Sequence, residues 1–378
     1  MRLKILFGLV CVCTACSGSG SDAPATVPTN TVSANIAPTA QATAPAVSVE
    51  GETAFLSGSS SNDPDGSITS FSWRQVSGPP VRLMGANTET TSFQAPLVSS
   101  RSVLSFELTV TDDDGAVGMT TLDTEIDLAA RSSIVEIETV FEGEDRAYSV
   151  YTPANYETGN PAVVLLHGGS GSMREVLRPQ ATTSGWIDHA ETDGFLLIVP
   201  NGYNETLGDG LGDEQSWNDI RTDFSGRTSL QDDQGFILTL MNEIEAARGY
   251  DASRAFVTGS SNGGIMTFGL LIEEPDRFFG GASFIAALPE EIIQDPLSTT
   301  PIMILNGTDD QLVLFGGGPV SLNGAPTRSV PDTIDYWLDN NDADIAAAVT
   351  VDLPDTVPSD GCQILETTYP SLFDDQTV

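Results

Sequence analysis

The sequence predicts two folded domains, a small all-β sandwich followed by a larger α/β domain. The chain has 378 residues, enough for two domains of ordinary size, and 40% of them are hydrophobic. Short alternating strands separated by tight turns fill residues 44–128, whereas longer apolar runs alternate with helical patterns over residues 133–378. The first pattern is typical of an antiparallel sandwich. The second is typical of a mainly parallel sheet covered by helices.

Residues 1–16 indicate an export signal. Arg2 and Lys4 precede an apolar run over residues 5–12, which is too short to span a bilayer as a helix. Residues 12–16 resemble a bacterial lipobox, which implies that cleavage leaves a lipidated Cys16 at the new N-terminus. We therefore expect an exported lipoprotein, anchored to the outer membrane or the cell surface. The alternative is an ordinary signal peptide cut nearby, which would give a secreted protein.

The charge balance excludes one class of partner. Asp and Glu number 53 against 15 Lys and Arg, so the formal net charge is −38. Nucleic acids and anionic membrane surfaces are bound through a basic footprint, so we expect neither to be the main partner. A strongly acidic, solvated surface is the expectation that remains, and membrane contact is expected only through the lipid.

The first domain is expected to follow a flexible linker. Residues 17–43 are rich in Ser, Gly, Ala, Pro and Thr and show no hydrophobic period, which predicts a tether. Strand patterns then occur at residues 47–49, 70–73 and 104–110, separated by turns rich in Asp, Pro and Gly. Residues 44–128 therefore predict a small β-sandwich.

Two stretches of this segment resemble a PKD-type (polycystic kidney disease) domain. They are SSSNDPDGSITSFSWRQVSGPP from Ser59 to Pro80 and FELTVTDDDGAVG from Phe106 to Gly118. The Asp-Pro-Asp-Gly turn, a core Trp73 and the Leu-Thr-Val-Thr-Asp strand end all fall where that family has them. The resemblance implies a spacer or adhesion module on a secreted enzyme.

Three carboxylates of this domain are candidate calcium ligands. Asp63, Asp65 and Asp112 stand on tight loops, and closely spaced carboxylates suit a hard cation. The alternative is turn chemistry, in which each Asp accepts hydrogen bonds from nearby backbone N–H groups.

The second domain shows alternating strands and helices. Buried strands are expected at residues 162–166, 195–199, 255–258, 282–286 and 302–305, and helices at 236–248, 264–272 and 331–339. This order predicts an α/β fold.

The sharpest catalytic motif is FVTGSSNGG, which starts at Phe256. A strand runs into Gly-x-Ser-x-Gly and then into a helix, the arrangement of a nucleophile elbow. The glycine spacing selects Ser261 as the nucleophile and excludes its neighbour Ser260. The backbone N–H of Asn262, the residue after the serine, is then one candidate oxyanion-hole donor.

A second motif, VVLLHGG from Val163, ends a buried strand in His-Gly-Gly. Folds with a nucleophile elbow take their other oxyanion donor from such a loop, so the N–H of Gly169 is the second candidate. His167 is then expected to be structural. The triad acid is expected just past a strand that follows the nucleophile, where PIMILNGTDD offers both Asp309 and Asp310.

From Ala147 onward the chain resembles the poly(3-hydroxybutyrate) depolymerase and feruloyl esterase family of α/β-hydrolases. The matching stretches occur in family order: YSVYTPANY, VVLLHGG, FLLIVPNGYN, SWNDIR, DDQGFI, FVTGSSNGGIMTFGL and ILNGTDDQLVLFGGG. The resemblance implies a serine esterase of α/β-hydrolase fold that needs no cofactor and acts on polyester, feruloyl or acetyl esters. The family spacing Gly-Thr-x-Asp favours Asp310 as the acid. The resemblance also places Trp217 near the acyl or aryl group, with a packing role as the alternative.

Histidine departs from the family pattern. The chain has two, His167 and His189, and both precede the nucleophile, whereas the order in this fold is Ser, acid, His. The family continues past the present end with another strand and a His-bearing loop. We therefore expect a C-terminally truncated hydrolase that lacks the last strand and is inactive or nearly so. The alternatives are a pseudoenzyme or polymer-binding adhesion lipoprotein with this fold, and a peptidase.

Overall fold

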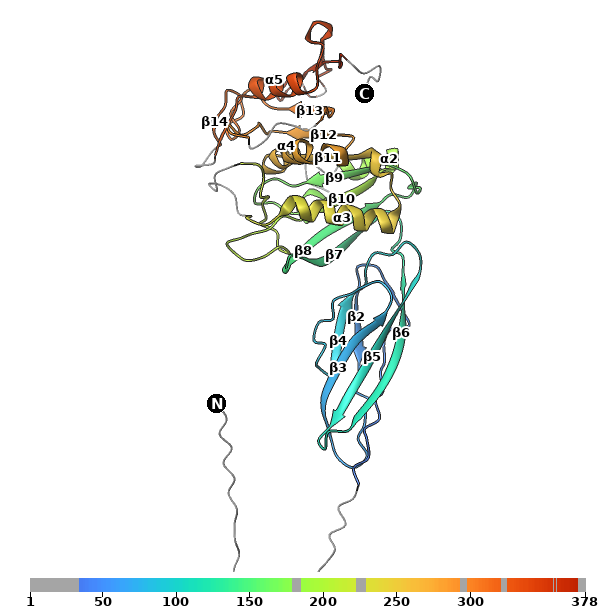
Figure 1. The fold of residues 1–378 in the computed structure, drawn as a ribbon. Coiled ribbons are helices and arrows are strands. Elements are labelled where there is room, and N and C mark those ends of the chain that lie inside the picture. Colours follow the sequence, from blue (N-terminus) through green and yellow to red (C-terminus); the bar gives the residue numbers. More distant parts are fainter. Residues whose placement is uncertain are drawn as a thin grey trace, which may run out of the picture.

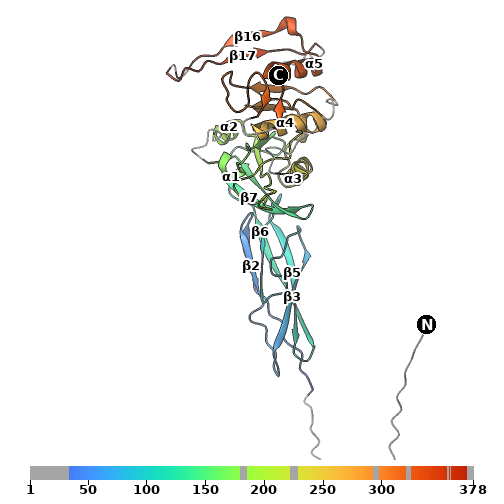
Figure 2. The same ribbon diagram turned by 90° about the vertical axis from the view of Figure 1, so that its left-hand side faces the viewer.

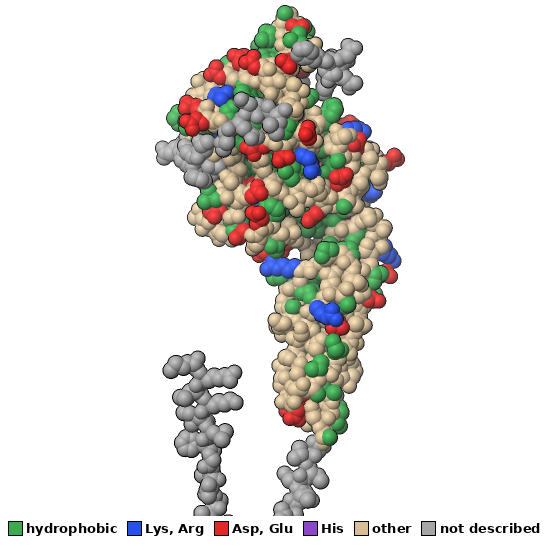
Figure 3. Space-filling model, in the orientation of Figure 1, with side chains coloured by type: hydrophobic (Ala, Val, Ile, Leu, Met, Phe, Trp, Pro, Cys, Tyr) green, Lys and Arg blue, Asp and Glu red, His purple; other side chains and the backbone are tan. Residues whose placement is uncertain are grey.

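The computed structural model describes residues 34–178, 185–221, 229–292, 298–320, 325–355, 357 and 359–372. It shows an elongated molecule in which a β-sandwich extends from one end of an α/β domain (Figure 1). The export signal and Cys16 lie outside the described residues. No helix in the described ranges is both long and apolar enough to cross a membrane. Acidic side chains are scattered over the visible face of the α/β domain, with few basic ones between them (Figure 3).

The sandwich packs a four-stranded sheet against a strand pair. The sheet has the order β1 (Val47–Val49), β6 (Val117–Asp127), β5 (Ser102–Asp112), β3 (Ile68–Ser77), and the pair is β2 (Thr53–Ser57) with β4 (Thr90–Gln94). Alternate side chains of β5 point inward, which is the period of a half-buried strand. Trp73 lies in the core, as predicted, and its indole N–H donates to the carbonyl of Thr88.

The sandwich includes part of the predicted linker. The backbone of Thr39 pairs with Asn62, that of Thr43 pairs with Ser57, and the Asn35 amide donates to Asp112. Residues 35–43 therefore lie along the sandwich instead of forming the tether that composition predicts. Their extended backbone finds partners on the neighbouring chain, and Ala40 and Ala42 pack against the sandwich core, although such small side chains give only a weak strand signal in the sequence.

The α/β domain is built on a seven-stranded sheet. Its order is β13 (Ile302–Leu305), β12 (Gly280–Phe284), β11 (Ala255–Ser260), β9 (Ala162–Leu166), β10 (Leu196–Pro200), β8 (Glu144–Thr152), β7 (Ser133–Phe141). Strands β13 to β10 are mutually parallel, whereas β8 runs antiparallel to both β10 and β7. The predicted α/β class with a mainly parallel sheet is confirmed.

Helices cover both faces of the sheet (Figure 2). They are α1 (Met173–Val176), α2 (Gly185–Asp193), α3 (Asp233–Arg248), α4 (Asn262–Glu273) and α5 (Val330–Asn340), with 3₁₀ turns η1 (Ala252–Arg254), η2 (Pro275–Arg277) and η3 (Ile345–Ala347). Val163 and Leu165 of β9 pack with α1 and α2, whereas Val164 and Leu166 pack with α3 and α4. Because both faces are covered, all five residues of β9 are buried.

The last part of the chain lies outside the main sheet. The short pair β14 (Gly318–Pro319) and β15 (Pro326–Thr327) precedes α5, and the hairpin of β16 (Val349–Asp352) and β17 (Leu365–Thr368) follows it. All residues of these two strands are exposed. Strand β13 forms one end of the seven-stranded sheet, and its Met303 is 51% exposed.

Candidate active site

The candidate catalytic residues follow strands that end at the same edge of the sheet. Strands β9, β11, β12 and β13 are parallel, so their carboxyl ends lie side by side. The loops after them are joined by backbone hydrogen bonds, from Ser261 N to Phe284 O at 2.9 Å and from Ile285 N to Leu305 O at 2.8 Å. This edge therefore holds the segments that carry Gly169, Ser261 and Asp310.

Ser261 occupies a strained turn between β11 and α4. Its backbone angles are φ 54° and ψ −120°, a conformation that costs about 1–3 kcal/mol in a residue other than glycine. The flanking glycines allow this turn. A Cβ on Gly259 would collide with the carbonyl oxygen of Gly263, and one on Gly263 would collide with that of His167. The Gly-x-Ser-x-Gly spacing thus has the steric basis of a nucleophile elbow.

The Ser261 hydroxyl is available for chemistry. The side chain is half-buried, and its Oγ makes no hydrogen bond to any residue in the described ranges. Ser260, in contrast, is the last residue of β11. A strained, unpartnered hydroxyl at a strand-to-helix turn is what nucleophilic attack requires.

The two candidate oxyanion donors lie on adjacent segments. Asn262 is the first residue of α4, where the N–H groups of the first turn have no partner within the helix. Gly169 is exposed on residues 168–172, the glycine loop, and a Cβ added to it would lie 3.5 Å from the Cβ of Asn262. Backbone N–H groups from the two segments can therefore converge on one oxygen.

The side chain of Asn262 ties the elbow to a neighbouring loop. Its Oδ1 accepts from the Trp217 backbone N–H at 2.7 Å, and its Nδ2 donates to the Trp217 carbonyl at 3.2 Å and to Asp219 Oδ2 at 2.5 Å. Asp219 also binds the guanidinium of Arg221 through both carboxylate oxygens. Sequence reasoning missed these roles of Asp219 and Arg221, although both stand within the family stretch SWNDIR.

Trp217 continues this connection to the glycine loop. Its side chain is fully buried, and its indole N–H donates to the His167 carbonyl at 2.8 Å. The rings of His167 and Trp217 lie 4.6 Å apart. A fully buried indole that faces other protein groups favours the packing role over the substrate contact that the resemblance implies.

His167 is held by two backbone groups. Its Nε2 accepts from Gly202 N–H at 3.0 Å, which leaves the proton on Nδ1 to be donated to the Gly168 carbonyl at 2.7 Å. Burial lowers the pKa of His167 to about 4, so the ring is neutral at neutral pH. Both nitrogens are engaged, which leaves no acceptor for the serine proton and agrees with the expected structural role.

His189 is placed away from the elbow. It lies on α2 with its side chain 71% exposed, and its Nδ1 is 3.8 Å from Asp193 Oδ2. Helix α2 packs on the face of the sheet opposite to α4. Neither histidine of the sequence is therefore positioned as a general base for Ser261.

The two candidate acids after β13 differ in how they are held. Asp310 is half-buried, and its Oδ1 accepts from the N–H groups of Leu312 at 2.7 Å and Val313 at 3.0 Å. Its Oδ2 has no hydrogen bond to a described residue. Asp309 is exposed, and only its backbone carbonyl is bonded, to the Gln311 amide. A carboxylate fixed at one oxygen and free at the other can orient a histidine, so the geometry favours Asp310.

The three candidate calcium ligands lie in the sandwich. Asp65 accepts from Ile36 N–H, and Asp112 accepts from the Asn35 amide and from the N–H groups of Asp114 and Ala116, as turn chemistry predicts.

Asp63 differs from these two, because both of its carboxylate oxygens are buried without a hydrogen-bond partner in the described ranges. Burial and the nearby carboxylates of Asp112 and Asp65 raise its pKa. Within the described part of the chain, no three His, Cys, Asp or Glu side chains form a group that could hold a metal ion. Calcium binding stays a prediction.

Comparison with known proteins finds a PKD-type family model and several esterases similar to this chain. A family model of the PKD domain matches residues 44–123. The protein NocK of Nocardia uniformis subsp. tsuyamanensis is 30% identical over 185 residues, which cover 48% of this chain and 49% of NocK. Feruloyl esterase B of Neurospora crassa is 31% identical over 134 residues, which cover 35% of this chain and 41% of that enzyme.

The match to a crystal structure of a thermostable esterase covers 79% of this chain and 83% of the esterase chain, with 12% sequence identity and a TM-score of 0.38. The chain spans about half the length of the first curated relatives it matches. The resemblance stated from the sequence is confirmed at the level of an α/β-hydrolase similar to esterases, preceded by a PKD-type domain.

Proposed function

We propose that this α/β-hydrolase is a serine carboxylic ester hydrolase with Ser261 as its nucleophile. The observation that supports the proposal most strongly is the strained φ of 54° at Ser261, between a buried strand and a helix. Such strain persists only where the surrounding structure enforces it, and it is concentrated at functional sites. The similarity to feruloyl esterase B and to other esterases supports the same reaction class.

In this proposal the Ser261 Oγ attacks the ester carbonyl carbon. A C–O bond forms as the carbonyl oxygen takes up negative charge, which the N–H groups of Asn262 and Gly169 stabilise. The N-terminus of α4 adds its positive dipole end. The alcohol then leaves, and water hydrolyses the acyl-serine.

The serine proton needs a base that neither histidine of this chain supplies. His167 is committed at both nitrogens, and His189 lies on the other face of the sheet. We assign the base to a histidine outside these 378 residues, oriented by the free Oδ2 of Asp310. The chain alone is then expected to be inactive or nearly so.

The substrate class and location extend the proposal. Feruloyl or acetyl esters are supported by the similarity to feruloyl esterase B and acetylxylan esterase A, whereas a polyester substrate rests on the resemblance of the sequence motifs alone. Export, with a lipid on Cys16, is supported by the apolar run and lipobox-like stretch at the start of the sequence. No cofactor is needed for acyl transfer through a serine.

Chemical rescue tests the proposal directly. The chain from residue 17 is assayed with p-nitrophenyl acetate and methyl ferulate over a series of imidazole concentrations, beside the Ser261→Ala variant. Imidazole also hydrolyses activated esters in solution, so only the difference between the two proteins counts. We expect imidazole to accelerate hydrolysis more in the unmodified chain. Equal rates at every imidazole concentration would contradict the assignment of Ser261.

A second candidate function is binding without catalysis. Two observations favour it: both ring nitrogens of His167 are engaged by backbone groups, and His189 lies on a helix on the opposite face of the sheet. It predicts that the chain adsorbs to a polyester or feruloylated polymer and that Ser261→Ala adsorbs equally well, with no imidazole-dependent hydrolysis by either protein.

A further inference from the structure

The sandwich and the α/β domain meet at a buried ion pair. Glu50 follows β1 and is 4% exposed, and Arg248 is the last residue of α3. The Arg248 Nη2 lies 2.7 Å from Glu50 Oε2, and its Nη1 lies 3.0 Å from Oε1. The side chain of Arg248 is 7% exposed and that of Glu50 is 0% exposed. Water is therefore largely excluded from this ion pair.

The Glu50 carboxylate is satisfied by three separate segments. Besides Arg248, it accepts from Val98 N–H at 2.6 Å and from Ala129 N–H at 2.9 Å. Arg248 in turn donates to the Val98 carbonyl at 2.9 Å. Val98 belongs to the β4–β5 loop, and Ala129 belongs to the connection between the domains. A buried carboxylate needs this degree of pairing, so the junction is a built contact.

Gln94, at the end of β4, extends the contact to strand β7. Its Nε2 donates to the carbonyls of Gly51 and Glu136, both at 3.1 Å, and its Oε1 accepts from Glu138 N–H at 2.7 Å. Gly51 approaches so closely that a Cβ there would lie 3.0 Å from Val135 Cγ1. Strand β7 is the edge of the seven-stranded sheet, and the sandwich supplies partners for part of that edge.

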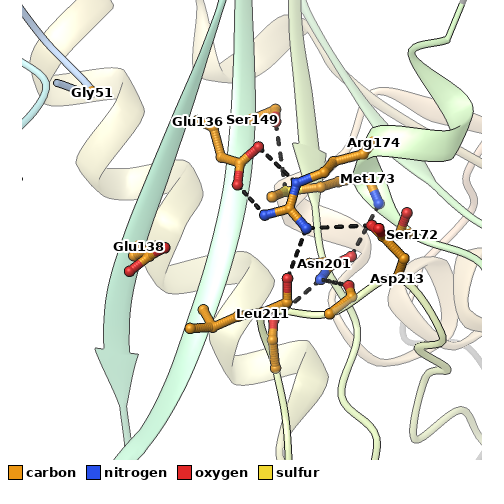
Figure 4. A network of polar contacts seen from close by, with 12 residues as sticks. Gly51, Glu136, Glu138, Ser149, Ser172, Met173, Arg174, Asn201, Leu211 and Asp213 are labelled. Atoms are coloured by element: carbon orange, nitrogen blue, oxygen red, sulfur yellow. Dashed lines mark hydrogen bonds and ion pairs between the residues drawn. The ribbon is translucent and has the colours of Figure 1, made fainter. Parts of the chain in front are cut away.

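The side chain of Glu136 connects β7 to helix α1, which follows the glycine loop. Its carboxylate binds the guanidinium of Arg174, with Arg174 Nε donating to Oε2 at 2.9 Å (Figure 4). Arg174 also donates to the Leu211 carbonyl at 2.8 Å. Arg174 is the second residue of α1, which follows the glycine loop directly. Next to it, Met173 N–H donates to Asn201 Oδ1 at 3.0 Å.

We propose that the PKD-type sandwich is docked rigidly on the α/β domain and holds the glycine loop in place through Gln94, Glu136 and Arg174. The sandwich then fixes the position of the loop that carries Gly169, whereas a freely moving spacer would not. The docking itself is inferred from contacts in the fold. Only the role of Gly169 as an oxyanion donor rests on the proposed function.

Hydrogen exchange measured by mass spectrometry on the full chain tests the proposal without any need for activity. The variant Gln94→Ala removes the three hydrogen bonds that the Gln94 side chain makes to Gly51 and to β7. Gln41→Ala, at an exposed glutamine of the same sandwich, is the matched control. Three lost hydrogen bonds predict exchange of residues 169–177 that is faster on the order of tenfold in Gln94→Ala. Gln41→Ala should leave this segment unchanged.

Calorimetry on the unmodified chain gives an independent measurement. Rigid docking predicts one unfolding transition with equal calorimetric and van't Hoff enthalpies. Two separate transitions would overturn the proposal, as would unchanged exchange at residues 169–177 in a folded Gln94→Ala. Neither result depends on esterase activity, so failure here is distinct from failure of the proposed function.

Discussion

Replacing Arg248 by methionine removes the guanidinium from the junction but keeps most of the apolar stem. Glu50 is then left as a buried carboxylate with only the N–H groups of Val98 and Ala129. Removing one partner of a buried ion pair typically costs about 3–5 kcal/mol of unfolding free energy. The equivalent change at Arg74, whose pair with Glu107 is exposed, is expected to cost about 0–1 kcal/mol.

Urea unfolding of the full chain measures both variants, and Glu50→Gln completes a double-mutant cycle. The side-chain amide introduced by Glu50→Gln keeps an oxygen for the backbone donors but carries no charge. The combined Glu50→Gln/Arg248→Met variant should therefore lose less stability than the sum of the single changes, by about 0.5–3 kcal/mol. Equal costs for Arg248→Met and Arg74→Met, or strict additivity in the cycle, would refute the reasoning.

Three further predictions concern the active-site region. Trp217→Phe removes the donor to the His167 carbonyl and should cost about 1–3 kcal/mol of stability and slow the imidazole-rescued reaction, whereas Trp186→Phe, on α2, should leave that rate unchanged. Gly263→Ala drives a methyl group into the His167 carbonyl oxygen and should lower stability by about 1–3 kcal/mol in thermal unfolding, whereas Gly316→Ala, where no atom lies within 4 Å of the added Cβ, should lower it little. The folded-state pKa of His167 is about 4, below its ordinary 6.5, so the unfolded chain binds the proton first as the pH falls. The stability contributed by the neutral, buried His167 is complete above pH 6.5 and is lost towards pH 4. The free energy of unfolding should therefore change less between pH 7 and pH 5 in His167→Asn than in the unmodified chain or in His189→Asn. Equal changes in all three proteins would contradict the assignment.

Local patterns predicted much of the fold and the elbow. The apolar runs at β9 and β13 and the glycines around Ser261 depend on neighbours in sequence, so their conformation follows from spacing alone. The sequence also indicated that His167 is structural. The structure adds the reason, which is the donor Gly202, 35 positions away.

Other features depend on contacts between distant segments. The resemblance placed Trp217 near substrate, but its indole is buried in the core, and its backbone is bonded to the Asn262 amide, 45 positions later. The tether prediction failed for residues 35–43 because their partners are backbone groups of the sandwich. Glu50 and Arg248 are 198 positions apart, and no periodicity pairs them. A single sequence does not encode such pairs in any local pattern.

Acylation of Ser261 tests the central claim most directly. The chain from residue 17 is incubated with p-nitrophenyl acetate and imidazole, digested, and analysed by peptide mass spectrometry. We predict acetyl on the peptide that contains Ser261 in the unmodified chain, and none at this position in Ser261→Ala. Acetyl found only elsewhere, or equally in both proteins, would contradict the account of this chain as a serine ester hydrolase.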